Sequence, residues 1–157
     1  MMRLKIAISF LSALMAGGAA LADAELPESA RIALSDIPPA VNRLVAQSCG
    51  AETADRSQWD TYKMPLKPAG AVFFVQCRFP ASNDVHTVVT QHPDGKARLG
   101  RFSDGQPEVF NVRWDEGSQI ITDISQSGAG CVHLRKWQWN RNRFVLAEKK
   151  TIDCASQ

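Results

Sequence analysis

The chain has 157 residues, with 18 Lys and Arg against 16 Asp and Glu, so its formal net charge is only +2. This balance argues against nucleic acid as the main partner, because nucleic-acid-binding proteins usually carry a strong positive field. It does not exclude a local basic patch.

Residues 1–24 have the three parts of a secretory signal peptide. A basic start, Met1 to Lys5, precedes an apolar run from Ile6 to Leu21, and Ala22-Asp23-Ala24 supplies a small-residue cleavage site. Cleavage after Ala24 or after Ala22 fits equally. A membrane anchor is disfavoured because the run is shorter than the roughly 20 residues that span a bilayer, and no lipobox cysteine follows it. We therefore expect an exported protein, periplasmic or secreted, with residues 25–157 as its single domain.

All four cysteines lie in this domain, at Cys49, Cys77, Cys131 and Cys154. An even number of cysteines in an exported protein predicts disulfides. No pair has the C-x-x-C spacing of a zinc site or a thioredoxin-type motif. Three pairings are open, and we expect Cys49–Cys77 and Cys131–Cys154. The second would close a loop of about 23 residues, which chain entropy converts to roughly 3 kcal/mol of stability.

The first part of the domain predicts an arm and then a helix. Residues 25–37 show no clear period and are interpreted as an arm on the surface. A helix is expected to begin near Pro38-Pro39, because Ser35 or Asp36 can cap it and proline is tolerated in a first turn.

The apolar positions of this helix lie on one face, at Val41, Leu44 and Val45. Cys49-Gly50 marks its end, since glycine suits the left-handed position after a helix. Residues 51–70 are expected to form a long surface connection, with a short strand around Tyr62 to Leu66.

From Ala71 onward the pattern changes to strands separated by Gly- and Asp-rich turns. The expected strands before the last hairpin are residues 72–79, 85–91, 96–102, 108–114 and 119–125. With the two strands of that hairpin, they predict an antiparallel meander.

The stretch from Cys131 to Cys154 reads as two strands joined by a tight turn. Alternate residues of a strand share a face, and one face of the first strand would hold Cys131, His133, Arg135, Trp137 and Trp139. Such a row can hold a sugar ring or a peptide by stacking, with Arg135 as hydrogen-bond donor. In the alternative interpretation Trp137 and Trp139 are core residues that pack against Phe144.

The same hairpin is locally basic. Glu148 is opposed by six cations, at Arg135, Lys136, Arg141, Arg143, Lys149 and Lys150. In an exported protein this patch favours an anionic partner, such as lipid phosphates, acidic glycans or an acidic protein surface. The alternative is a solvated edge, because lysines on outer strands prevent edge-to-edge pairing.

Familiar catalytic and metal-binding motifs are missing from the sequence. The histidines, His86, His92 and His133, form no H-E-x-x-H or H-x-H pattern, so neither a metal site nor a cofactor is expected. There is no G-x-S-x-G elbow and no glycine-rich phosphate loop between a strand and a helix. A site assembled in space around His133 remains an alternative, because such sites leave no linear motif.

The order of motifs after residue 70 resembles an exported bacterial family. They are Gly128-Ala129-Gly130 before Cys131, Trp137-x-Trp139, Phe144-x-Leu146 and the final Cys154. Together they resemble the second half of domain-of-unknown-function family eleven seventy-six. Members usually have Asp-Gly after the Trp, where this chain has Asn140-Arg141. The resemblance implies export and paired cysteines, and it implies no catalytic residues.

These observations predict a mainly β (α+β) domain, an antiparallel meander of about seven strands with one N-terminal helix and two disulfides. We expect an exported, non-catalytic binding or accessory protein of the cell envelope, of an inhibitor-like kind. Its partner would be an envelope protein or an anionic envelope component. The residues expected to bind are His133, Arg135, Trp137, Trp139, Arg141 and Arg143. The alternatives are an envelope hydrolase built around His133 and a structural or stress-related protein, which would have no pocket.

Overall fold

The computed structural model describes residues 25–49, 59–78, 84–105, 108–127, 130–152 and 154. The expected signal peptide, residues 1–24, lies outside the described residues. The elements in chain order are η1 (Glu28–Ala30), η2 (Leu34–Asp36), α1 (Pro39–Cys49), β1 (Thr61–Pro65), β2 (Ala71–Arg78), β3 (Val85–Gln91), β4 (Ala97–Leu99), β5 (Glu108–Phe110), β6 (Arg113–Asp115), β7 (Ile120–Gln126), β8 (Val132–Trp139) and β9 (Phe144–Ile152).

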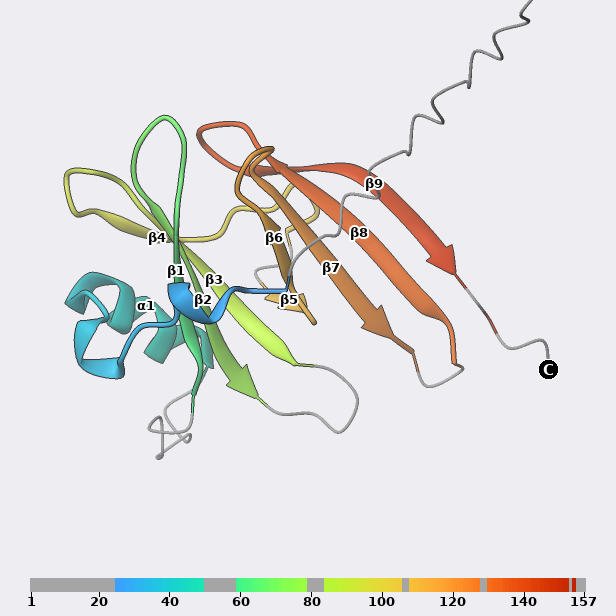
Figure 1. Cartoon of the computed structure of the whole chain (residues 1–157), viewed down its shortest axis with the longest axis horizontal. Coiled ribbons are helices and arrows are strands. Elements are labelled where there is room, and N and C mark those ends of the chain that lie inside the picture. Colours follow the sequence, from blue (N-terminus) through green and yellow to red (C-terminus); the bar gives the residue numbers. More distant parts are fainter. Residues whose placement is uncertain are drawn as a thin grey trace, which may run out of the picture.

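The strands form two antiparallel sheets (Figure 1). In the first sheet the order is β1-β2-β3-β4, and β5 pairs with a different part of β3. In the second sheet the order is β6-β7-β8-β9. Most strands pair with their neighbours in the chain, so the mainly β, antiparallel fold class predicted from the sequence is confirmed.

The first sheet lies between α1 and the second sheet, which gives the fold three layers (Figure 1). On β2, Phe73 packs in a cluster with Val41 and Val45 of α1. Its neighbour Phe74 packs in a second cluster with Trp137 of the second sheet. Successive side chains of a strand point to opposite faces, and both faces of a middle-layer strand are covered. The apolar run of β2 from Ala71 to Val75 suits this position, because it presents apolar side chains to both layers.

The predicted helix is confirmed as α1. Val41 and Val45 are buried and lie one turn apart, so they form the face toward the sheet. A helix of this length is marginal alone, and its packing against the sheet stabilises it. The disulfide Cys49–Cys77 joins its last residue to β2, which confirms the expected pairing.

The closing hairpin is also confirmed, because β8 and β9 pair along their length. The second disulfide, Cys131–Cys154, joins the two outer ends of this hairpin, as expected. The register shifts within the hairpin because Lys136 pairs with Glu148 whereas Trp137 pairs with Leu146. The residue between them on β9, Ala147, forms a β-bulge.

Residues 108–114 were expected to form one strand, and this prediction is wrong. They form the two short strands β5 and β6, which belong to different sheets. Asn111 lies between them in a left-handed conformation with φ of 41°. Its side-chain Nδ2 donates to the carbonyl of Ile124 at 2.7 Å. The break at Asn111 carries the chain between the sheets and raises the strand number above the predicted seven.

The strand expected over residues 96–102 is reduced to the three residues of β4. After β4 the chain crosses to the edge of the second sheet, where Phe102 forms a parallel bridge with Phe144. The amide of Phe144 donates to the carbonyl of Arg101 at 2.7 Å, and the amide of Ser103 donates to the carbonyl of Phe144 at 3.0 Å. These bonds cover the first residues of β9 and tie the two sheets together.

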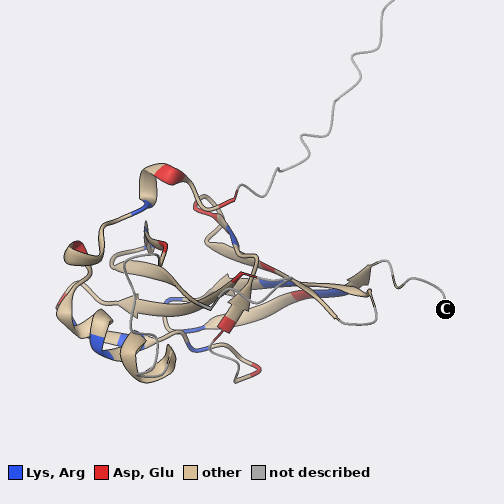
Figure 2. Cartoon of the chain, turned by 90° about the horizontal axis from the view of Figure 1, so that it is seen from below, with Lys and Arg blue, Asp and Glu red and all other residues tan. Residues whose placement is uncertain are grey.

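Charged residues of both signs are dispersed over the elements (Figure 2). This distribution agrees with the small net charge of the sequence. A concentration of positive charge must therefore be local.

Candidate ligand-binding pocket

A cavity of about 480 Å³ lies where three turns of the chain meet. They are the turn after β1 at residues 66–69, the β3–β4 turn at residues 92–96 and the β8–β9 turn at residues 140–143. Figure 1 shows the three turns at the same end of the molecule. The volume falls within the range of small-molecule sites, about 300–1,000 Å³.

Gln119 holds the first of these turns against the second sheet. Its side-chain Oε1 accepts a hydrogen bond from the amide of Lys67 at 2.9 Å, and its Nε2 donates to the carbonyl of Glu116 at 2.8 Å. Its own carbonyl accepts from the amide of Trp139 at 3.0 Å. Because Gln119 is buried, these bonds satisfy a polar group that would otherwise be costly to bury. Gln119 therefore fixes the position of the turn at residues 66–69, which forms one wall of the cavity.

Gly70 allows the first and second turns to approach closely. It has a φ of +107°, and a Cβ at this position would lie 2.5 Å from the carbonyl oxygen of Gln91. Only glycine accepts both the backbone conformation and this approach.

Trp139 supplies the large aromatic surface of the cavity. Its indole Nε1 donates to the carbonyl of Lys67 at 3.2 Å, and its ring packs against Phe144 with centroids 4.9 Å apart. The ring is half-buried and lines the cavity. Its polar atom and one part of its surface are therefore held by the protein, while the remainder can meet a ligand.

Positive charge dominates the lining of the cavity. Four cations line it, Lys67, Lys96, Arg98 and Arg141, with one carboxylate, Asp94. Asp94 lies 3.0 Å from Lys96 Nζ and 3.2 Å from His92 Nδ1. Hydrogen bonds from the backbone and side chain of Lys96 lower the pKa of Asp94 to about 2. Asp94 therefore stays ionised near neutral pH and offsets one positive charge.

Arg98 and Arg141 form no ion pair with any residue in the part of the chain that the structure describes. Their guanidinium groups are planar forks that match carboxylate and phosphate geometry. The electrostatics of the cavity therefore favour an anion.

Arg141 has an unusual backbone conformation. Its φ is 75°, in the left-handed region that favours glycine. The side chain of Asn140 stabilises this turn, because its Oδ1 accepts from the amides of Asn142 and Arg143 at 3.3 and 3.0 Å. A conformational cost maintained at a cavity wall is typical of a functional position.

Of the residues expected to bind, Trp137 requires a correction. It is only 1% exposed and packs between the sheets, edge-on to Phe102 with ring centroids 5.1 Å apart. The core interpretation is right for Trp137, and this residue has no surface for a ligand. Trp139 shares its strand face but lies at the strand end, beside the turns, where it is only partly buried.

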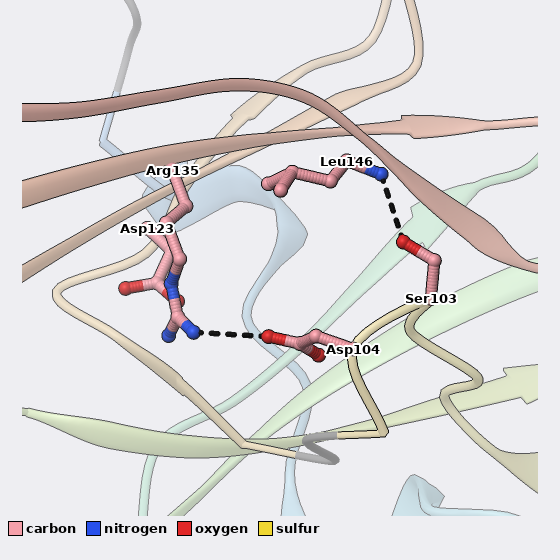
Figure 3. A network of polar contacts seen from close by, with 5 residues as sticks. All are labelled: Ser103, Asp104, Asp123, Arg135 and Leu146. Atoms are coloured by element: carbon pink, nitrogen blue, oxygen red, sulfur yellow. Dashed lines mark hydrogen bonds and ion pairs between the residues drawn. The ribbon is translucent and has the colours of Figure 1, made fainter.

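Arg135 lies in an ion-pair network beneath the second sheet (Figure 3). Its guanidinium contacts Asp123 at 2.5 Å and Asp104 at 3.2 Å, and it lies over the Trp137 ring, 5.5 Å from the centroid. Asp123 is fully buried, and burial raises the pKa of its carboxyl against the opposing effect of Arg135. The guanidinium of Arg135, which we expected to donate hydrogen bonds to a ligand, therefore holds the turn that contains Asp104 against β7 and β8. In the same turn, Ser103 Oγ accepts from the amide of Leu146 at 3.1 Å.

The other predicted residues lie apart from one another. His133 Nδ1 lies 3.2 Å from the hydroxyl of Thr151, and its cross-strand partners are Ser125 and Thr151. Arg143 is exposed but does not line the cavity. The structure thus brings only Trp139 and Arg141 of the predicted set into the pocket.

The sequence reasoning missed the contributions of Lys67, Lys96, Arg98 and Gln119. These residues come from turns and strand ends that are distant from the closing hairpin in the sequence. One signal was available, since residues 51–70 were expected to form a long connection and such connections are often functional.

Two further properties of the described residues bear on function. No group of three or more His, Cys, Asp or Glu residues that could hold a metal ion occurs among the described residues. No helix within the described ranges is long and apolar enough to cross a membrane.

Comparisons with known proteins found no relative of this chain. No protein-family model matches the chain, and neither the curated proteins nor the solved structures contain a significant match.

Proposed function

We propose that this chain is an exported, non-catalytic binding or accessory protein of the cell envelope, and that the pocket binds an anionic envelope component. The observation that carries this proposal is the cavity itself, in which the half-buried ring of Trp139 lies among four cations. An aromatic surface combined with convergent donors is the usual composition of a ligand site. The signal-peptide pattern of residues 1–24 supports export.

The geometry favours binding over the two alternatives. A hydrolase built around His133 would need a carboxylate to orient the imidazole. The neighbours of His133 across the sheet are instead Ser125 and Thr151. A purely structural protein was expected to have no pocket, whereas a cavity of about 480 Å³ is present.

The test is co-sedimentation of the oxidised mature protein with isolated envelope fractions, at low and at high ionic strength. We expect retention at low salt and release at high salt, because salt screens interactions between exposed charges. Arg141→Glu should abolish retention. Arg143→Glu is the matched control, since it makes the same charge change in the same turn but outside the cavity.

Equal loss of retention in both variants would show that the hairpin binds by general charge and not through the pocket. Absence of retention at either salt concentration would refute envelope binding altogether.

A further inference from the structure

We infer that the pocket recognises a sugar unit that carries a carboxylate or a phosphate group. This inference rests on the proposed function and names the chemical class of its ligand. Three features of the cavity support it: the placement of the aromatic ring, the character of the remaining walls and the position of the guanidinium groups.

The aromatic surface of the cavity comes from one indole ring, that of Trp139, which packs against the protein on one side. Trp139 packs on Phe144 and is fixed by its bond to Lys67, so its orientation is set before a ligand arrives. Apart from the imidazole of His92, it is the one aromatic ring lining the cavity within the described residues. A rigid indole binds the apolar C–H face of a sugar ring at little cost in conformational entropy.

The remaining walls are mixed. Besides the charged residues, the cavity is lined by the hydroxyl- and amide-bearing residues Thr90, Gln91 and Asn142 and by the apolar residues Leu66, Pro68 and Ala69. Gln91 donates its Nε2 to the carbonyl of Gly95 at 3.2 Å, which orients its amide oxygen. A sugar has one apolar face and a rim of hydroxyls, so its apolar face can meet the ring of Trp139 while its hydroxyls bond to these polar side chains.

The charge of the cavity favours an acidic group on the sugar. Arg98 of β4 and the β3–β4 turn contribute cations on one side, and Arg141 of the β8–β9 turn contributes one on the other. A neutral sugar would leave these guanidinium groups without a charged partner. A carboxylate or phosphate can accept two parallel hydrogen bonds from either of them.

Binding can be measured by calorimetry on the oxidised mature protein with four probes. Digalacturonate and glucose 6-phosphate are the acidic sugars, and galactobiose is the uncharged counterpart of digalacturonate. Adenosine monophosphate tests a nucleotide. We expect at least one acidic sugar to bind about 10-fold or more tightly than galactobiose, because hydrogen bonds to charged groups contribute strongly. The tighter of the two acidic probes identifies the anion as carboxylate or phosphate.

Two variants separate the roles of charge and ring. Arg141→Gly should weaken the acidic sugar about 10-fold and leave galactobiose unchanged, because it removes only a charged donor. Arg143→Gly is the control and should change neither affinity. Trp139→Phe should weaken the acidic and the uncharged sugar by a similar factor, because both use the ring.

The inference is overturned if galactobiose binds as tightly as both acidic sugars, if adenosine monophosphate binds most tightly, or if neither acidic sugar binds. These failures are distinguishable from failure of the proposed function. Retention on envelope fractions that depends on Arg141, without acidic-sugar binding, would refute only the ligand class.

Discussion

At the scale of the residue, Arg141 combines a backbone cost with a charged side chain at the cavity. A non-glycine residue with φ near 75° is strained because its Cβ approaches the backbone. Arg141→Gly should therefore raise the free energy of unfolding, by about 1 kcal/mol, while it weakens ligand binding. Chemical denaturation measures this change. Arg143 lacks a positive φ, so Arg143→Gly should lower stability by a similar amount; equal signs for the two variants would contradict the argument.

His86 makes the stability of the fold depend on pH. Burial lowers the pKa of His86 to about 4, despite the opposing charges of Asp84 and Asp60. In the unfolded chain the pKa of histidine is about 6.5, so the unfolded state binds more protons between these values. Stability should be complete above pH 6.5 and should fall as pH falls toward 4, by about 3 kcal/mol.

Denaturation curves between pH 4 and pH 7 test this prediction. His86→Gln removes the titrating group, so the slope of stability against pH in this range should become much smaller. An unchanged slope in the variant would assign the pH dependence to other groups.

At the scale of the element, the network of Asp123, Arg135 and Asp104 fastens the turn before β5 to β7 and β8. Asp123 is fully buried and Arg135 is 17% exposed. Removing the charge of Asp123 leaves the largely buried guanidinium of Arg135 with only the more exposed carboxylate of Asp104 as counter-charge. Asp123→Asn should lower the free energy of unfolding by about 3 kcal/mol.

Asp104→Asn is the comparison, because this carboxylate is more exposed and its ion pair is screened by solvent. It should cost less than about 1 kcal/mol. Equal costs for the two substitutions, measured by urea denaturation, would show that burial does not decide the strength of this network.

At the scale of the whole molecule, the two disulfides and the pocket lie at opposite ends of the strands. Cys77 lies near the end of β2, whose first residue follows Gly70 at the pocket. Cys131 precedes β8, whose last residue is Trp139. At about 3.3 Å per residue, each disulfide lies roughly 25 Å along its strand from the pocket.

Replacing Cys49 and Cys77 together by alanine should therefore lower stability without changing the pocket. The link spans 28 residues, and chain entropy suggests a loss of about 3 kcal/mol. Thermal denaturation measures the loss, and the affinity for the acidic sugar should stay within about twofold at a temperature where the variant is folded. A large fall in affinity of the folded variant would show that the two ends are coupled.

Local sequence patterns were sufficient to predict most elements. The helix, the strand of residues 85–91 and the closing hairpin follow from periodicity and turn residues, and the cysteine number predicts two disulfides. These patterns depend on a few neighbouring residues or on covalent bonding, so they can be recognised without knowledge of the fold. The division of residues 108–114 was not predictable in this way, because a polar contact from Asn111 to the distant Ile124 accompanies it.

The sequence by itself thus determined the mainly β class, the helix and the presence of two disulfides in this protein. Only the tertiary structure decided the pocket and the separate roles of Trp137 and Trp139. The two tryptophans have the same type, strand and face, and they differ in whether another layer covers their position. The cations of the pocket come from three turns far apart in the chain. Burial and proximity depend on how the layers pack, and no pattern within one segment records that packing.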